Sequence, residues 1–331
     1  MALVDWTGNR VGLLGQRAKL NRREVEAQYV EFGDDGPKTL GFGWSSLEDS
    51  FKYKVKQPTI STVGKITKRT ILSDIVSLFD PMGLVAPVIM KAKLIMHWLQ
   101  MDKVAWDEPV PRYIYKEWSN FAENLPALEE LLIKRHLVYE KGARVQLHAF
   151  AYTSGKTYGA VVYARITHKE RIQIMLLGAK TRIAPTRKEL SIERLGLCSA
   201  VMAAELLQSI SDSLQIPTFI KNFVWLGSHA ALAWIAKRPS KWEDFVAERV
   251  AKIHKLKHTE WNFVEYEENP ARIATGGLCP SKLKSNKLWW CGPHWLPRHE
   301  SWWPNAVDEQ LKMFEEARAQ QFRGTSDSTT A

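Results

Sequence analysis

Three apolar stretches follow one another between residues 144 and 183, and they constrain the fold of this 331-residue chain more than any other feature. The stretches RVQLHAFAYT, YGAVVYARIT and RIQIMLLGAKTRI are rich in β-branched and aromatic residues, and only the short polar turns SGKT and HKE separate them. Turns this short join antiparallel neighbours, because a parallel connection needs a dozen or more residues. The sequence therefore predicts an antiparallel meander of three strands.

The text after the meander alternates between helical and strand patterns. It predicts a long helix over 187–214, a strand over 219–228, helices over 229–239 and 242–256, and a strand over 260–268. The order is then β-β-β-α-β-α-α-β. This order predicts an α/β fold with a mixed sheet and flanking helices.

The first 140 residues have a different pattern of apolar and polar residues. Residues 39–56 alternate apolar and polar on both sides of a turn at 45–49, which predicts a β-hairpin. Helices are predicted from Thr67 to the DPMG turn, from near Pro87 onward, and over 113–132. No catalytic residue types are concentrated in this helical part.

Charge and composition narrow the classes of partner. Lys and Arg outnumber Asp and Glu by 46 to 36, and the resulting charge of +10 favours polyanionic partners. No apolar run approaches the roughly 20 residues that span a bilayer, and the N-terminus lacks the pattern of a signal peptide. We therefore expect an intracellular chain that has no membrane partner.

Two candidate sites fail on their sequence context. Asp34 and Asp35 stand before Gly-Pro instead of an apolar strand, so they predict a solvated turn and not a polymerase carboxylate pair. Cys291, His294 and His299 lack the further ligands that a zinc site needs, so no metal site is predicted there.

A tryptophan-rich segment closes the ordered part of the sequence. Its rings can either stack on nucleic-acid bases or fold back as core cover, and the sequence favours core cover. The rings belong to Trp289, Trp290, Trp295, Trp302 and Trp303.

Several of these stretches carry a resemblance to a known family. The words TKRTILSDIVSLFDPMGLVAPV, LHAFAYTSGKTYGAVVY, RLGLCSAVMAAELL, NPARIATGGL and WWCGPHWL resemble the polyprotein of BEL/Pao-type LTR retrotransposons, in its Pao retrotransposon peptidase region. The resemblance implies an RNase H-like fold, preceded by a helical thumb/connection-like region and a short β-hairpin remnant of a reverse transcriptase palm. The polymerase catalytic words are not found, so no polymerase activity is expected.

The resemblance also implies a division into four parts. Residues 1–60 are expected to be the palm-end remnant with its hairpin, and 61–140 the thumb/connection-like region. Residues 141–285 are expected to form the RNase H-like domain, and 286–331 the tryptophan-rich segment followed by a disordered tail.

In this family the resemblance implies a two-magnesium nuclease site that cuts the RNA strand of an RNA–DNA hybrid. Its four carboxylates lie in the words HgFaDAS, PRLEL, wtDS and NPAD. The matching words here are HAFAYTS, IERLGL, VWLGS and NPARIA, and the matching residues are Tyr152, Gly196, Gly227 and Arg272.

None of these four residues is an anionic oxygen ligand of the kind that Mg²⁺ requires. The nearby Glu193 supplies only one carboxylate, too few for a two-metal site. We therefore expect no intact catalytic residue, no Mg²⁺ cofactor and no ribonuclease H activity, which makes the chain a pseudoenzyme.

Three functions stay open on the sequence alone. The first is a retrotransposon-derived relic, or a module exapted by its host, that binds an RNA–DNA hybrid or a single strand. The second is a protein–protein interaction module, in which the connection and RNase H-like parts contact another protein, and the third is a residual hybrid ribonuclease. Separately, the apolar face of the hairpin at 39–56 is expected to be partly exposed and to promote association. The candidate residues for nucleic-acid contact are Lys65, Lys68, Arg69, Lys180, Arg182 and Arg272.

Overall fold

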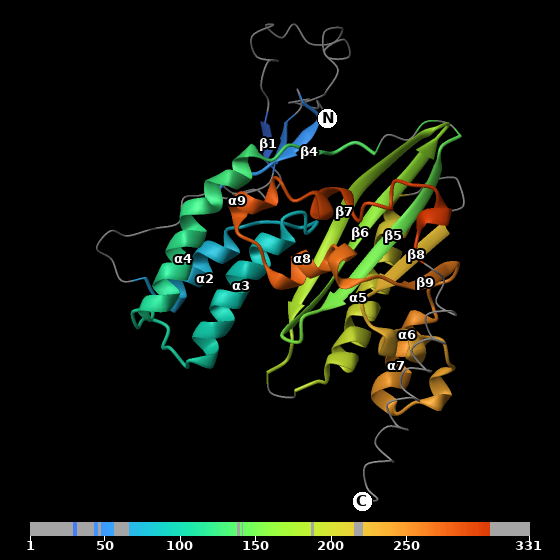
Figure 1. Cartoon of the computed structure of the whole chain (residues 1–331). Coiled ribbons are helices and arrows are strands. Elements are labelled where there is room, and N and C mark those ends of the chain that lie inside the picture. Colours follow the sequence, from blue (N-terminus) through green and yellow to red (C-terminus); the bar gives the residue numbers. More distant parts are fainter. Residues whose placement is uncertain are drawn as a thin grey trace, which may run out of the picture. The chain divides into compact units, whose positions relative to one another are not determined.

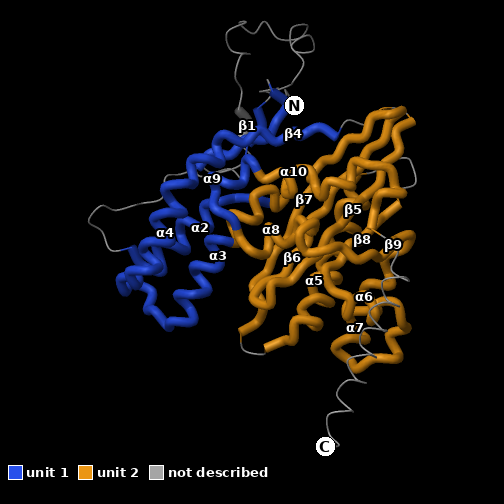
Figure 2. Tube along the Cα trace, in the orientation of Figure 1, with its two compact units in different colours: residues 1–81, 91–138, 278–285 blue, residues 82–90, 139–277, 286–331 orange. Residues whose placement is uncertain are grey.

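The computed structural model divides the chain into two compact units, which Figure 2 colours separately. Unit 1 comprises residues 1–81, 91–138 and 278–285, and unit 2 comprises residues 82–90, 139–277 and 286–331. The structure describes residues 29–31, 43–45, 48–55, 66–137, 140, 142–186, 189–214 and 221–304. The predicted turn at Asp34 and Asp35, the candidate Lys65 and the predicted tail after residue 304 lie outside these residues.

Unit 2 is built on a five-stranded mixed sheet of order β7-β6-β5-β8-β9 (Figure 1). The predicted meander is confirmed, with β5–β6 and β6–β7 antiparallel, while β8 and β9 add in parallel. This is the strand arrangement expected of an RNase H-like sheet. The strands are β5 Arg144–Thr153, β6 Thr157–His168, β7 Arg171–Ile183, β8 Lys221–Leu226 and β9 Thr259–Phe263.

Helices flank this sheet, as the sequence predicts. A Cβ at Gly178 would lie 3.7 Å from Ile210 of the long helix α5, so the row of Gly178 and its partner Val162 faces that helix. Gly159 and Val162 are an odd number of residues apart in the same strand, so they point to opposite faces of the sheet. A Cβ at Gly159 would lie 3.1 Å from Thr275 of the short helix α8, which lies on that other face. The helices and 3₁₀ turns of unit 2 are α5 Ile192–Leu214, α6 His229–Ile235, η2 Pro239–Lys241, α7 Asp244–Ile253, η3 Tyr266–Glu268, α8 Ala271–Gly276, α10 Lys287–Cys291 and η4 Glu300–Trp302.

The tryptophan-rich segment covers the face of the sheet opposite α5. Trp289 and Trp295 are 0% and 3% exposed, and Trp225 of β8 lies 4.6 Å from the Trp295 ring centroid. The Trp289 indole donates to the carbonyl of Leu84 at 2.9 Å. The prediction of core cover is therefore confirmed for Trp289 and Trp295, but it is wrong for Trp302, whose side chain is 64% exposed.

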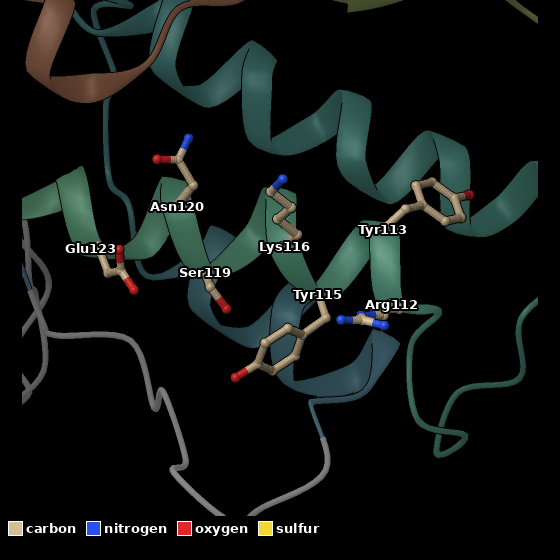
Figure 3. Close-up of a pocket in the computed structure, with 7 residues that line it drawn as sticks. All are labelled: Arg112, Tyr113, Tyr115, Lys116, Ser119, Asn120 and Glu123. Carbon is tan, nitrogen blue, oxygen red and sulfur yellow. The ribbon is translucent and has the colours of Figure 1, made fainter.

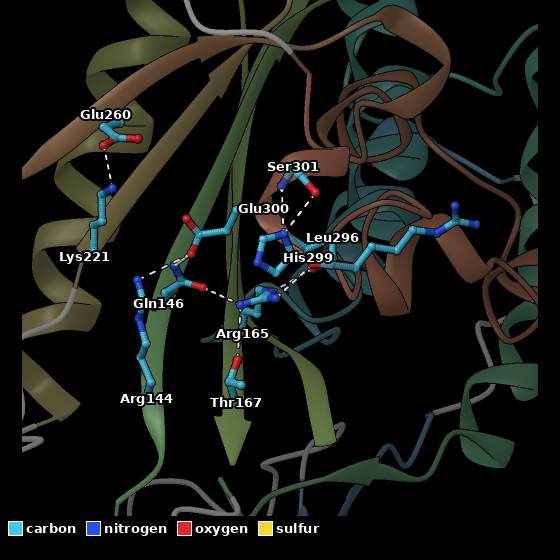
Figure 4. A network of polar contacts seen from close by, with 11 residues as sticks. Arg144, Gln146, Arg165, Thr167, Lys221, Glu260, Leu296, His299, Glu300 and Ser301 are labelled. Atoms are coloured by element: carbon cyan, nitrogen blue, oxygen red, sulfur yellow. Dashed lines mark hydrogen bonds and ion pairs between the residues drawn. The ribbon is translucent and has the colours of Figure 1, made fainter. Parts of the chain in front are cut away.

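A buried arginine ties this segment to the sheet (Figure 4). Arg165 of β6 is 5% exposed and donates to the Gln146 amide oxygen at 2.6 Å. It also donates to the carbonyls of Leu296 at 3.0 Å and Arg298 at 2.9 Å. Burial lowers the pKa of Arg165. These hydrogen bonds stabilise a charge that is otherwise costly to remove from water.

The DPMG turn closes the free edge of β7. The Ala179 amide donates to the carbonyl of Met82 at 2.9 Å. Gly83 follows with φ +73°, and a Cβ there would lie 1.9 Å from the Ala179 carbonyl oxygen. Only glycine allows both this backbone conformation and this approach, so the turn satisfies a sheet edge that is otherwise open to unwanted pairing.

Unit 1 contains a small antiparallel sheet of order β1-β2-β3-β4. The predicted hairpin is confirmed as β2 and β3, with Trp44 opposite Phe51. The Asp49 carboxylate in its turn accepts from the Trp44 indole at 2.9 Å and from Arg135 at 2.7 Å. The strands are β1 Tyr29–Glu31, β2 Gly43–Ser45, β3 Ser50–Lys52 and β4 Ile133–Lys134, and the outer two were not predicted.

Three of the remaining helices follow the sequence prediction closely, whereas the short helix Pro280–Leu283 was not predicted. Thr67 caps α2 through a reciprocal pair of hydrogen bonds with Thr70. The helix predicted over 113–132 is α-helical only as far as Asn124, and the chain continues from there as a 3₁₀ helix. The bounds are α2 Lys68–Val76, α3 Ala86–Met101, α4 Arg112–Asn124, η1 Leu125–Glu130 and α9 Pro280–Leu283. Among the described helices, none has both the length and the apolar character that crossing a bilayer requires.

Gly83→Ala is expected to lower the free energy of unfolding by more than about 2 kcal/mol, because it adds strain at a positive φ and a clash with the Ala179 carbonyl. Gly142→Ala is the matched control, since it shares a positive φ of 90° but has no atom within 4 Å. Urea denaturation measures both. Equal losses in the two variants would contradict the role given to the turn.

His148 predicts a pH dependence of stability. It is fully buried, its Nδ1 accepts from the Trp225 indole at 3.2 Å, and burial followed by the charge of Arg165 holds its pKa well below 6.5. Below pH 6.5 the unfolded chain binds a proton that the folded chain does not, so stability falls by about 1.4 kcal/mol per pH unit.

The measurement is urea denaturation between pH 7 and the lowest pH at which the fold persists, on wild type and His148→Phe. His148→Phe should lose the part of the pH dependence of stability that comes from His148. His136→Asn, a change at an exposed imidazole, is the control and should keep it.

Candidate functional site

The four positions that the sequence resemblance aligns with carboxylates come from four different parts of the fold. Tyr152 lies near the end of β5, and Gly227 directly follows β8. Gly196 lies in the first turns of α5, and Arg272 is the second residue of α8. Because β5 and β8 are parallel neighbours, their carboxyl ends meet at one edge of the sheet, which is where α/β folds place their sites.

Tyr152 and Gly227 are in close contact. A Cβ at Gly227 would lie 3.0 Å from Cδ2 of the Tyr152 ring and 3.4 Å from Nδ2 of Asn269. The buried Asn269 amide donates to the carbonyl of Ala151 at 3.0 Å, and the Gly227 amide donates to the same carbonyl at 3.3 Å. The aromatic ring thus takes the space beside position 227, and glycine is the residue that fits there.

Gly196 adjoins the same turn. A Cβ at this position would lie 2.9 Å from Oγ of Ser228 and 3.0 Å from its Cβ. The Ser228 hydroxyl caps α6 by accepting from the Ala231 amide at 3.3 Å. The absence of a side chain at Gly196 lets α5 approach the turn between β8 and α6. Since Ser228 is engaged as a helix cap and the neighbouring His229 stacks on Phe263 at 3.8 Å, these two side chains form no nucleophile pair.

Arg272 reaches this cluster through a tyrosine. Its guanidinium lies 4.9 Å from the Tyr266 ring centroid, and that ring lies 5.6 Å from the Tyr152 ring. Nε of Arg272 is buried and has no hydrogen-bond partner. Burial and the neighbouring Tyr266 raise the pKa of the Tyr152 phenol, and the charge of Arg272 opposes this shift. All four positions therefore converge around one place, with a neutral phenol and a cation where the resemblance leads us to expect acids.

These residues do not fit a magnesium pair. A protonated phenol and two glycines offer no anionic oxygen, and a guanidinium repels a dication. Within the described part of the chain, no group of three or more His, Cys, Asp or Glu side chains is placed to hold a metal ion. Glu193 is exposed, and hydrogen bonds to its own backbone and to Ser191 lower the pKa of its carboxyl.

The other two basic candidates of unit 2, Lys180 and Arg182, do not lie at the cluster around Tyr152. Tyr152, Gly159 and Thr181 lie side by side across three strands and point to one face. Lys180 and Arg182 alternate with Thr181, so they point to the opposite face. Both side chains are exposed.

The two described candidates of unit 1 have local partners. Arg69 forms a two-point ion pair with Asp107, at 2.7 and 2.9 Å. Lys68 lies 5.0 Å from the Trp106 ring centroid and donates to the carbonyl of Val104 at 3.4 Å. Of the three candidates in unit 2, Arg272 is the one that the structure brings to the cluster of Tyr152, Gly196 and Gly227.

Sequence reasoning missed two residues of the cluster, Tyr266 and Asn269. Asn269 is the first letter of the word NPAR, so its position was available, but its hydrogen bond to the end of β5 needed the fold. Tyr266 stands in the polar run EYEE, which carries no signal for a site.

A separate hollow of about 810 Å³ runs along α4 in unit 1 (Figure 3). The described residues that line it all belong to that helix, and they follow one another at helical spacing. They are Arg112, Tyr113, Tyr115, Lys116, Ser119, Asn120 and Glu123. Among the described residues a single helix supplies this wall, so the hollow brings together no groups from different described elements.

The strand order and the helices on both faces of the sheet give unit 2 an RNase H-like fold. Residues 67–228 match the family model of the Pao retrotransposon-like RNaseH-like domain. Tyr152, Gly196 and Gly227 lie within the match, and Arg272 lies beyond its end. No curated protein matches the chain.

Solved structures that resemble the chain include two RNase H proteins. The N-terminal RNase H domain from Mycobacterium tuberculosis is 11% identical, with 44% of this chain and 99% of that one covered and a TM-score of 0.28. RNase H1 from Halobacterium salinarum is 10% identical, with 39% and 90% covered and a TM-score of 0.25.

A foamy viral protease-reverse transcriptase, described in complex with double-stranded DNA, also resembles the chain. It is 12% identical, with 71% of this chain covered and a TM-score of 0.39. The match spans 38% of the viral protein.

The contact between Tyr152 and position 227 predicts an energetic coupling. Gly227→Ala should lower the free energy of unfolding by about 1–2 kcal/mol, because the added methyl group meets the Tyr152 ring. In a Tyr152→Ala background the same change should cost close to nothing, a coupling of about 1 kcal/mol or more in a double-mutant cycle. Gly276→Ala, with no atom within 4 Å, is the control and should show no coupling to Tyr152→Ala.

Proposed function

We propose that the RNase H-like unit is a nucleic-acid-binding module without nuclease activity, derived from a BEL/Pao retrotransposon Pol protein. The observation that carries this proposal is the convergence of the four substituted positions, which leaves Tyr152, two glycines and Arg272 where a nuclease needs carboxylates. Catalysis on two metals cannot proceed from such a set.

The substitutions also change what the site attracts. A carboxylate cluster repels the phosphate backbone unless metal ions neutralise it, whereas a phenol and a guanidinium do not. Phosphate contacts by Lys and Arg dominate non-specific affinity for nucleic acids, and the chain carries a formal charge of +10. The site is therefore suited to hold an RNA–DNA hybrid or a single strand without magnesium.

The family resemblance extends the proposal to the rest of the chain. Residues 1–60 are the remnant of a reverse transcriptase palm, residues 61–140 correspond to its thumb or connection, and residues 141–285 to the RNase H-like domain. In this view the chain is a Pol fragment, either a relic or a module that a host has put to use.

The test is a binding titration of the intact chain with labelled single-stranded DNA, RNA and RNA–DNA hybrid in the presence of EDTA. Binding should persist without magnesium and weaken steeply as salt increases, with a log–log slope of about −0.7 for each phosphate contacted on a single strand. Adding Mg²⁺ should produce no cleavage of the hybrid, and calorimetry should detect no saturable Mg²⁺ binding.

Two outcomes would contradict the proposal. A chain that binds no nucleic acid at low salt would instead be a protein-interaction module. Magnesium-dependent cleavage of the RNA strand, abolished in Glu193→Gln, would make it a residual ribonuclease.

A further inference from the structure

A pocket of about 450 Å³ adjoins Arg272 within unit 2. Arg272 and the neighbouring Glu267 and Glu268 line one side, and Lys287 and His294 come from the tryptophan-rich segment on the other. The volume is within the range of pockets that bind small molecules or parts of larger ligands. Its walls therefore join two segments that the sequence analysis treated separately.

Two cations of this pocket have no acidic partner. Neither Arg272 nor Lys287 forms an ion pair within the described residues, and Nε of Arg272 is a buried donor without an acceptor. Arg272 and Lys287 both line the pocket, so an anion that enters it meets two positive charges.

The acids of the pocket are less available than the cations. Glu268 accepts from His294 at 2.7 Å and from the Trp295 indole at 2.7 Å, so both of its oxygens are engaged. Glu267 is exposed, and the charges of both glutamates oppose an anion in the pocket.

An aromatic surface lies next to the unpaired guanidinium. Tyr266 is 51% exposed, and Arg272 lies 4.9 Å from its ring centroid. Exposed aromatic rings beside basic groups are the elements with which proteins hold single strands, since bases stack on the rings while cations contact the phosphates. Paired bases in a duplex do not offer their faces in this way.

We infer that the pocket formed by Arg272 and Lys287 binds a backbone phosphate of a single-stranded nucleic acid without a metal ion, and that Tyr266 stacks on an adjacent base. The inference rests on the proposed function and specifies its site and ligand. Glu268 is engaged by His294 and Trp295, so the two cations without acidic partners among the described residues are the groups placed to meet an anion.

The first experiment measures binding of the intact chain to a single-stranded oligonucleotide of about 12 nucleotides in EDTA. Arg272→Gln and Lys287→Gln should each weaken binding by about tenfold and reduce the log–log salt slope by about 0.7. Lys169→Gln is the matched control, because Lys169 directly follows β6 at the strand end opposite to Thr157. It should leave the affinity and the salt slope close to wild type.

Glu267→Gln tests whether the pocket binds an anion or a cation. Removing the opposing carboxylate should strengthen oligonucleotide binding by several-fold, on the order of that expected for one charge near a protein surface. If the pocket acted through a bound cation, wild-type binding would depend on added Mg²⁺ and Glu267→Gln would weaken it, which would overturn the inference.

Tyr266 is tested with a strand that lacks bases. Tyr266→Ala should weaken binding of the normal strand by about tenfold, and Tyr266→Phe should retain it. Binding of an abasic strand of equal length should be unchanged by either substitution. An equal loss on both strands would show that the ring only supports Arg272.

The outcomes separate this inference from the proposed function. If wild type binds and the Arg272, Lys287 and Tyr266 variants all behave like Lys169→Gln, nucleic-acid binding stands and this pocket is wrong as its site. If wild type binds no single strand and no hybrid, both are wrong. Circular dichroism and urea denaturation of each variant identify any loss that comes from unfolding.

Discussion

The structure of this site depends on how closely the chain packs where β5 and β8 end. Gly227 and Asn269 both donate to the carbonyl of Ala151, and together these hydrogen bonds fix the turn after β8 against the end of β5. The Tyr152 ring lies where a side chain at 227 would point. The substitutions at these two positions are therefore physically linked, because a large ring at one requires glycine at the other.

This packing also determines the electrostatics. A nuclease site needs several carboxylates held close together, which is unfavourable until metal ions neutralise them. Here Tyr152 is partly buried as a neutral group, and Arg272 lies over Tyr266 with no acid paired to it. Among the described residues, Nε of Arg272 is a buried donor at this site that has no hydrogen-bond partner.

Much of the fold follows from local sequence patterns. The strands predicted over 144–153 and 171–183 have those bounds in the structure, because long apolar runs between short turns leave few alternatives. The strands Tyr29–Glu31 and Ile133–Lys134 were missed, since two or three residues carry no periodicity. Trp302 was predicted to be buried with its neighbours, but its side chain is exposed. The number of tryptophans in a segment does not show which of their rings face the solvent.

The candidate site was harder to predict than the fold, and the reason is geometric. Motif words identified Tyr152 and Arg272 one at a time, but the contact between them passes through Tyr266, whose sequence context is an ordinary polar run. Lys180 and Arg182 illustrate the opposite error. Their alternation showed that they share a face, but only the register through Thr181 and Gly159 shows that this face is the one away from Tyr152. Sequence distance gives the period of a strand, whereas pairing register decides which side of the sheet a charge can serve.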